Sequence, residues 1–243
     1  MTRRRFFAPP GAFNFGKRTV MLTADEARHL REVLRLKPGD EVSVFDGEGK
    51  EFRARVVQAR RECAELELED EIEPARPESP LKITLAVALL KGEKFDLVVQ
   101  KATELGVVKI IPLITRYADI KLRDESDATK RVARWQRIAL EAAKQSGRSV
   151  VPELSLPKQL TSVLNPSNPC FLFSEREGHG LTQIETDQVT AIIGSEGGWS
   201  DEELEQARAA GAQIVTLGGR ILRAETAAVT AAALLQHRFG DLK

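Results

Sequence analysis

The stretch VTAIIGSEGGWSDEELEQARAAGAQIVTLGG, residues 189–219, decides the fold class of this chain. It begins with an unbroken apolar run, passes through a glycine-rich turn into an amphipathic segment, and ends in a second apolar run that leads into further glycines. Unbroken apolar strands are typical of parallel sheets whose two faces are covered by helices. The stretch therefore predicts a strand, a helix and a second strand of an α/β domain.

The helix inside this stretch has a complete start signal. Ser200 stands at the N-cap position, and Glu203 closes a capping box with it. Trp199 precedes the cap and can pack against Leu204 as a hydrophobic staple. Gly211 supplies the expected stop. We therefore expect one well-bounded helix between the two strands.

The same alternation extends toward the N-terminus as far as residue 81. Further buried strands are expected at ITLAVALL (83–90), VVKIIPLI (107–114) and CFLF (170–173). Apolar residues at helical spacing predict helices over about 95–105, 128–146 and 225–239. Residues 81–243 are therefore predicted to form one α/β domain.

Residues 1–72 predict a small, mostly β domain with one helix. Thr23 followed by Glu26 has the form of a capping box, which predicts a helix near 24–35. The segments EVSVF, EFRARVV and CAELELE alternate like half-buried antiparallel strands, a pattern typical of a compact barrel. Residues 73–80 carry prolines without apolar periodicity and are predicted to be a linker.

A net charge of zero conceals a strong asymmetry along the chain. Residues 1–61 hold 14 Lys or Arg against 8 Asp or Glu, whereas residues 62–80 hold 1 against 8. Phosphate binding depends on the local field, so the basic, phenylalanine-rich N-terminus suits RNA. A solvated tail beside core phenylalanines is the competing interpretation. The expected RNA contacts are Arg3, Arg4, Arg5, Lys17 and Arg18.

Membrane and metal functions have little support in the sequence. No apolar run approaches the roughly 20 residues of a membrane span, and the N-terminus lacks the apolar core of a secretory signal, which favours a cytoplasmic protein. The two cysteines and three histidines do not have the spacing of metal ligands. We therefore expect no metal and no membrane partner.

Two glycine-rich loops, 194–198 and 218–223, are the expected ligand site. Each follows the carboxyl end of a predicted strand, where open α/β sheets bind ligands, and glycine lets main-chain groups approach a ligand closely. Neither loop has the spacing of a P-loop, a dinucleotide fingerprint or a nucleophile elbow. Glycines that serve only tight turns are the competing interpretation, but two such loops in one sheet favour a shared pocket.

The chain resembles the bacterial 16S ribosomal RNA uracil-N3 methyltransferases, the RsmE family of the SPOUT superfamily. The resemblance spans essentially the whole chain and rests on RRFF (4–7), HLREVLRLKPGD (29–40), QKATELGV (100–107), QSGRSVVP (145–152), IGSEGGWSDEE (193–203) and LGGRILRAETA (217–227). One departure is Ser195, where the family usually has proline.

The resemblance implies both the architecture and the partners. It implies an N-terminal PUA-like β-barrel domain, followed by a SPOUT-type parallel sheet with a C-terminal trefoil knot. It also implies a homodimer, S-adenosylmethionine as the cofactor, and 16S ribosomal RNA of the small ribosomal subunit as the substrate. The cofactor residues that it implies are Leu172, Ser174, Ile193, Gly194, Glu196, Gly197, Gly198, Leu217, Gly218, Ile221, Leu222, Arg223, Glu225, Thr226 and Ala227.

Methylation of uridine N3 requires help with a proton, because N3 is protonated in neutral uracil. A general base can remove it, or cationic groups can stabilise the developing anion. We expect Glu196 as the base, and Arg116, Arg148 and Arg223 as anion or phosphate stabilisers. Structural ion pairs and loop hydrogen bonds are the competing roles of these residues.

Two alternative functions remain open. One is a SPOUT enzyme that methylates another RNA atom, such as a ribose 2′-hydroxyl. The other is a non-catalytic RNA-binding factor of ribosome assembly, in which the glycine loops are structural.

Overall fold

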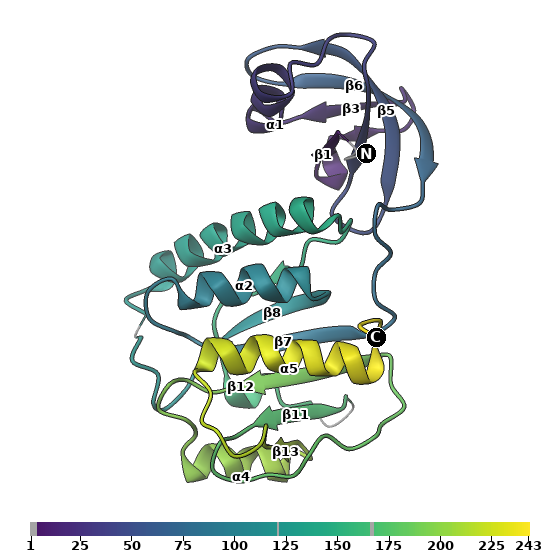
Figure 1. Cartoon of the computed structure of the whole chain (residues 1–243). Helices are drawn as coiled ribbons and strands as arrows, with labels where there is room; N and C mark the ends of the chain where they lie inside the picture. Colours follow the sequence, from purple (N-terminus) through teal and green to yellow (C-terminus); the bar gives the residue numbers. More distant parts are fainter. Residues whose placement is uncertain (1–3, 121, 166–167) are drawn as a thin grey trace. The chain divides into compact units, whose positions relative to one another are not determined.

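The computed structural model describes residues 4–120, 122–165 and 168–243. The chain forms two compact units, one of Met1–Glu78 with Ala143–Val151 and the other of Ser79–Ala142 with Pro152–Lys243 (Figure 1). The domain limits expected from the sequence, 1–72 and 81–243, stay a prediction. In the described part of the chain, no helix is both long and apolar enough to cross a membrane.

The first unit is built on a six-stranded, curled sheet in the order β1-β4-β5-β6-β3-β2. The β1–β4 pair is parallel and the other pairs are antiparallel. The strands are β1 (Arg5–Phe7), β2 (Phe13–Asn14), β3 (Thr19–Leu22), β4 (Glu41–Phe45), β5 (Glu51–Ala59) and β6 (Ala64–Ile72). Short helical segments are η1 (Pro10–Ala12), α1 (Ala24–Arg28) and the π-helical turn η2 (His29–Val33).

The predicted capping box at Thr23 is wrong. Thr23 occupies the N-cap position of α1, but its side chain makes no cap hydrogen bond. Glu26, the expected partner, is buried and forms an ion pair with Lys144, with Nζ and Oε1 2.7 Å apart. The Glu26 carboxylate, which the local pattern predicted to bind the main chain at the helix start, therefore pairs with a lysine far along the chain instead.

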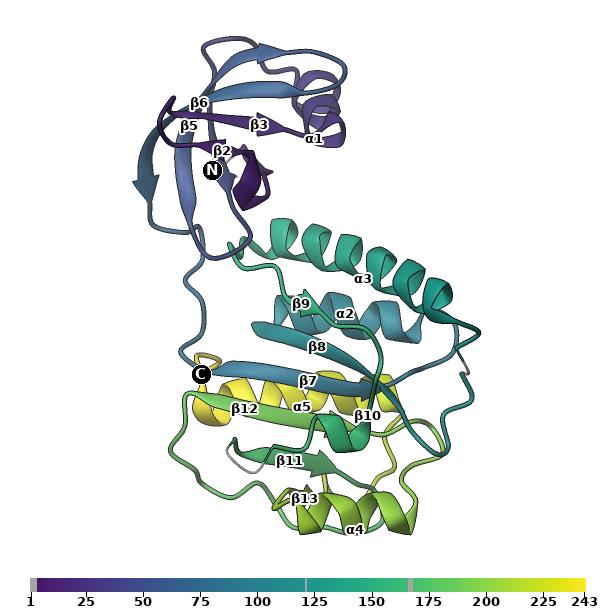
Figure 2. The same cartoon turned by 180° about the vertical axis from the view of Figure 1, so that it is seen from behind.

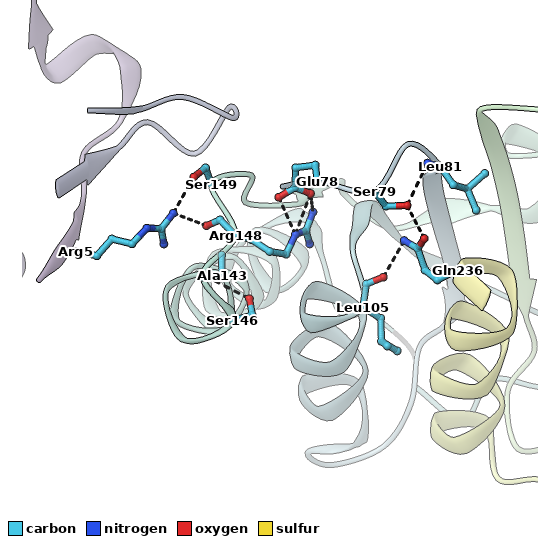
Figure 3. Close-up of polar contacts among 10 residues, drawn as sticks. All are labelled: Arg5, Glu78, Ser79, Leu81, Leu105, Ala143, Ser146, Arg148, Ser149 and Gln236. Carbon is cyan, nitrogen blue, oxygen red and sulfur yellow. Dashed lines mark hydrogen bonds and ion pairs between the residues drawn. The ribbon is translucent and has the colours of Figure 1, made fainter. Parts of the chain in front are cut away.

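The segment 143–151 belongs to the first unit through a buried polar network around Arg5 (Figure 3). The Arg5 guanidinium donates to the Arg148 carbonyl at 2.8 Å and to the Ser149 hydroxyl at 2.9 Å. Its Nε lies 3.1 Å from a carboxylate oxygen of Glu51, which is fully buried. Buried charges are stable only when they are paired in this way, so Arg5 has a structural role.

The second unit contains a seven-stranded, wholly parallel sheet in the order β10-β8-β7-β12-β11-β13, with β9 also paired to β8 (Figure 2). Its strands are β7 (Lys82–Ala88), β8 (Val107–Ile114), β9 (Glu153–Leu154), β10 (Lys158–Gln159), β11 (Cys170–Phe173), β12 (Gln188–Ile193) and β13 (Gln213–Val215). The predicted parallel α/β sheet is confirmed, and the strands expected at 107–114 and 170–173 have the predicted bounds.

Helices lie on both faces of this sheet, as parallel pairing requires. On one face lie α2 (Lys94–Glu104) and α5 (Ala224–Phe239), which contact each other and the strands β8, β7 and β12 (Figure 1). The long helix α3 (Glu125–Ser146) contacts α2 through the rings of Trp135 and Phe95, whose centroids are 4.2 Å apart. On the other face, α4 (Asp201–Ala209) and η3 (Leu160–Ser162) share a buried cluster with β11, β12 and β13.

The predicted start of α4 is confirmed. The Ser200 hydroxyl accepts from the Glu203 N–H at 3.3 Å, and the Glu203 carboxylate accepts from the Ser200 N–H at 2.9 Å. Trp199 and Leu204 lie in one buried cluster, as the staple requires. This end of the helix is therefore fixed next to the carboxyl end of β12.

Replacing Ser200 with alanine should lower the free energy of unfolding by about 1 kcal/mol, because one N-terminal N–H of α4 loses its acceptor. Thr23→Ala is the matched control: Thr23 has the same position at α1 but no cap hydrogen bond, so its loss should be within about 0.5 kcal/mol of zero. Urea unfolding followed by circular dichroism measures both. Equal losses of unfolding free energy in the two variants would contradict the conclusion that only Ser200 forms a cap hydrogen bond.

Candidate active site

A cavity of about 360 Å³ lies at the carboxyl ends of β11, β12 and β13. The loops after these strands and the first turn of α5 form its walls. Because β11 pairs with β12 on one side and β13 on the other, the three loops meet at one edge of the sheet. This is the edge at which open α/β sheets bind ligands, and the volume is that of a small-molecule site.

The glycines of the loop after β12 are required by packing. A Cβ at Gly194 would lie 3.1 Å from the Trp199 ring, and one at Gly197 would lie 2.7 Å from the Tyr117 Cβ. Gly198 has a φ of +70° and lies against Glu175. The Gly198 N–H donates to the Ser195 carbonyl at 3.0 Å, which closes a tight turn. Packing and turn geometry therefore account for the small size of these glycines, which also line the cavity.

The glycines of the loop after β13 are not crowded by neighbouring atoms. A Cβ at Gly218 would meet nothing within 4 Å, although this residue lines the cavity and has a φ of +86°. No neighbouring side chain therefore explains its small size. Its lack of a side chain keeps the cavity open, and its positive φ is one that other residues rarely adopt.

Glu196 lines the cavity and forms an ion pair with Lys94 at the start of α2, with Oε1 and Nζ 2.6 Å apart. Partial burial raises the pKa of the Glu196 carboxyl, but the hydrogen bond from Lys94, one from its own main-chain N–H and the charge of Lys94 together hold the pKa below its ordinary value. Glu196 is therefore ionised at neutral pH, and Lys94 makes it a weaker base than an isolated glutamate. Sequence reasoning missed Lys94, which lies 102 residues away.

The three candidate arginines have different surroundings. Arg223 is exposed, lines the cavity as the N-cap residue of α5, and makes no side-chain hydrogen bond or ion pair with the described residues. Arg116 is also exposed but lies outside this cavity. Arg148 is buried in the first unit and forms an ion pair with Glu78, at 2.6 Å (Figure 3). Among the three, only Arg223 lies in the cavity wall.

Most of the predicted cofactor residues come together. Those that line the cavity are Ser174, Ile193, Gly194, Glu196, Gly197, Gly198, Leu217, Gly218, Ile221, Leu222, Arg223 and Ala227. Leu172 is fully buried in the cluster beneath α4, and Glu225 and Thr226 follow the cavity wall along α5 without lining it. Ser195 and Arg220, within the expected loops, and Ala224, just after the second, also line the cavity. Sequence reasoning missed Phe173, Glu175, Trp199 and Thr216, which line it too.

Two buried polar atoms around the cavity make no hydrogen bond in the structure. The Ser195 hydroxyl is one, in a residue that is 7% exposed and lines the cavity. The other is a carboxylate oxygen of Glu225, in the first turn of α5. Buried polar atoms normally have partners, so the Ser195 hydroxyl, which lines the cavity, is suited to a polar ligand. No group of three or more potential metal ligands occurs among the described residues.

The predicted RNA contacts are also of several kinds. Arg3 lies outside the described residues. Arg4 and Lys17 are exposed. Arg5 is buried in its network, and the Arg18 guanidinium donates to the carbonyls of Leu68 and Glu69. Among the described members of the set, Arg4, Lys17 and Arg18 are exposed, and the Arg4 guanidinium also lies 4.0 Å from a carboxylate oxygen of Asp40.

Comparison with known proteins gives the class first. The model of a family described as "RNA methyltransferase domain" matches residues 77–236, and that of an "RNA methyltransferase PUA domain" matches residues 22–69. Fold, site and both matches place the chain in the class of RNA methyltransferases that carry a PUA domain.

Individual relatives give the family. Ribosomal RNA small subunit methyltransferase E from Synechocystis sp. is 38% identical over 225 residues, which cover 88% of this chain and 72% of the relative. The crystal structure of the Neisseria gonorrhoeae protein of that name, bound to S-adenosylmethionine, superposes with a TM-score of 0.87 at 36% identity, covering 99% of this chain and 100% of that one. A Legionella pneumophila methyltransferase in complex with the same cofactor gives a TM-score of 0.89 at 33% identity, with both chains fully covered. The chain belongs to the family of ribosomal RNA small subunit methyltransferase E.

Replacing Lys94 with methionine should raise the pKa of Glu196, because burial still disfavours the charged carboxylate while the stabilising cation is gone. In the native protein, the stabilisation from this pair is present above the ordinary glutamate pKa and is lost as the pH falls through the lowered value. Carbon-13 NMR titration of the Glu196 carboxyl measures the shift. Lys101→Met, which removes a lysine paired with Glu104 on the same helix, should leave it unchanged. An unchanged value in the Lys94 variant would reject the assigned cause.

Proposed function

We propose that this chain transfers the methyl group of S-adenosylmethionine to N3 of a uridine in 16S ribosomal RNA of the small ribosomal subunit. The observation that carries the proposal is the cavity at the carboxyl ends of β11, β12 and β13, which Glu196 and Arg223 both line. Membership of the family supports the cofactor and the class of RNA. The choice of N3 rests on the resemblance of the sequence motifs and on the chemistry of these two residues.

The residues around the cavity fit a ligand that combines an apolar ring with polar groups. Phe173, Ile221 and Leu222 line the cavity with apolar side chains, while the loops after β12 and β13 add main-chain groups. The unpartnered hydroxyl of Ser195, which lines the cavity, is available to the polar end of a ligand. We propose that this cofactor site also takes in two predicted residues next to the wall, the buried Leu172 and the exposed Thr226.

When bound, S-adenosylmethionine supplies a methyl carbon on a positively charged sulfur, and the carbon–sulfur bond breaks with its electron pair remaining on sulfur. The protein must hold the acceptor in line and remove its proton. We propose that the Glu196 carboxylate takes the N3 proton, so that the nitrogen lone pair can form the new bond to carbon. Because its pKa is lowered, Glu196 is ionised and ready to accept a proton at neutral pH.

Arg223 is proposed to stabilise the anion that develops on the uracil carbonyl oxygens. It lines the cavity, and its guanidinium has no partner among the described residues, so binding the substrate breaks no existing ion pair. Preorganised cations of this kind lower the energy of a developing negative charge. This stabilisation compensates for the modest basicity of Glu196. Arg148 is proposed to keep its ion pair with Glu78 and to act structurally.

The remaining proposals concern assembly and location. We propose that the first unit holds the RNA backbone through Arg4 and Lys17, and that the enzyme acts in the cytoplasm. Support for a trefoil knot comes from the family resemblance alone. A homodimer is supported by the family resemblance and also by Ile221. This residue lines the cavity yet is 84% exposed, which suits a site that a second copy of the chain helps to cover.

Replacing Gly218 with valine should abolish S-adenosylmethionine binding, because the added side chain would enter the cavity. Gly219→Val is the matched control, since the neighbouring glycine has equally open surroundings but does not line the cavity. Isothermal titration calorimetry with S-adenosylmethionine measures both variants, and circular dichroism verifies folding. Normal affinity in a folded Gly218 variant would place the cofactor elsewhere.

The reaction itself is tested by incubating the protein with methyl-labelled S-adenosylmethionine and either naked 16S ribosomal RNA or assembled small subunits. Mass spectrometry of the digested RNA should find 3-methyluridine, and Glu196→Gln should lower the rate while cofactor binding persists. Detection of a 2′-O-methylated nucleoside instead would show that the methyl acceptor is the ribose hydroxyl and not N3. Cofactor binding without any transfer to either RNA would favour a non-catalytic factor.

A further inference from the structure

A second cavity, of about 520 Å³, lies on the other side of the start of α4. The end of β8, the segment around β10 and η3, and the first turns of α4 enclose it. Its polar side chains include those of Thr115, Arg116, Gln159, Thr161, Glu202 and Gln206. This volume is also within the range of small-molecule sites, and no residue of the proposed methyl-transfer site lines it.

Short structural links join this cavity to the first one. Ser200 lines the second cavity, and the preceding residue, Trp199, lines the first. The Arg116 N–H donates to the Glu203 carboxylate at 2.9 Å, which ties the loop after β8 to the capping box of α4. Tyr117, the next residue, packs against Gly197 of the first cavity. The two cavities therefore lie on either side of the segment Trp199–Ser200.

The Arg116 guanidinium is available to a ligand. The residue is exposed, and its side chain makes no hydrogen bond or ion pair within the part of the chain that the structure describes. Several exposed arginines of this protein are paired with a carboxylate, such as Arg55 with Glu69 and Arg208 with Glu177. A free guanidinium at the edge of a cavity offers a planar fork of N–H donors.

Acceptors lie beside this donor. Both oxygens of the Glu203 carboxylate already accept from main-chain N–H groups. Hydrogen bonds from its own N–H and from the Ser200 side chain lower the pKa of Glu202, which therefore presents an ionised carboxylate. With one arginine and two glutamates, the cavity wall has an excess of negative charge. Phosphate is therefore disfavoured, and a neutral group with both donors and acceptors is favoured.

We infer that this second cavity holds the base of an unpaired nucleotide that neighbours the methylated uridine in the RNA. Guanine fits best, because its O6 and N7 atoms accept from a guanidinium while its N1–H and amino groups donate to a carboxylate. The inference rests on the proposed function. It assigns Arg116 to recognition of the RNA sequence, at a site separate from the cofactor.

Arg116→Gln tests the guanidinium. The dissociation constant for protein-free 16S ribosomal RNA should rise about tenfold, and the KM for RNA should rise with it, while calorimetry shows unchanged S-adenosylmethionine affinity. Arg123→Gln is the matched control, because Arg123 is also exposed, makes no side-chain hydrogen bond or ion pair with the described residues, and lines neither cavity. An equal loss in both variants would reveal a general charge effect and overturn the inference.

Gln206→Trp tests the cavity itself. The new side chain should fill it and weaken RNA binding as Arg116→Gln does, whereas Glu205→Trp, at the preceding exposed position of α4, should not. Wild-type RNA affinity in a folded Gln206 variant overturns the inference. Failure of the wild-type protein to bind the cofactor or methylate any RNA would instead reject the proposed function, so the two failures are distinguishable.

Photo-crosslinking tests the identity of the base. Ribosomal RNA transcribed with 6-thioguanosine should crosslink to peptides that contain Arg116 or Gln206, and competition with unmodified RNA should remove the signal. Crosslinks at these peptides from 4-thiouridine alone would overturn the assignment of guanine. No crosslink there from either nucleoside would overturn the cavity as an RNA site.

Discussion

The indole of Trp199 fixes the geometry on which the proposed site depends. Its Nε1–H donates to the Phe173 carbonyl at the end of β11, at 2.8 Å, and the ring is 2% exposed. Gly194, at the end of β12, lies so close to this ring that a Cβ would be crowded. One side chain therefore holds two neighbouring strand ends in place, and the capped helix α4 begins directly after it. The cavity keeps its shape because these parts cannot move separately.

Signals that depend on a few neighbouring residues predicted the fold well. The apolar runs placed β8 and β11 at their observed bounds, and the Ser200 capping box is present because all of its atoms lie within one helical turn. The same motif at Thr23 failed because Lys144, far along the chain, binds Glu26. A sequence pattern cannot reveal a competing partner that the tertiary fold brings in.

The candidate site was predictable as a region but not as a set of contacts. Strand ends and glycines located the loops after β12 and β13, because parallel topology places them together. Sequence alone could not separate the glycines that packing requires from Gly218, which faces open space. Nor could it pair Lys94 with Glu196 or Arg148 with Glu78, since both ion pairs join residues at least 70 positions apart.

The network around Arg5 has a consequence for synthesis of the chain. The first unit needs Ser149 and the Arg148 carbonyl to complete the hydrogen bonds of a buried guanidinium. At elongation rates of about 5–20 residues per second, several seconds separate the emergence of β6 from that of this segment. During this interval the nascent β-sheet lacks two partners of Arg5. The amino-terminal unit therefore reaches its final stability only after much of the following unit has left the ribosome.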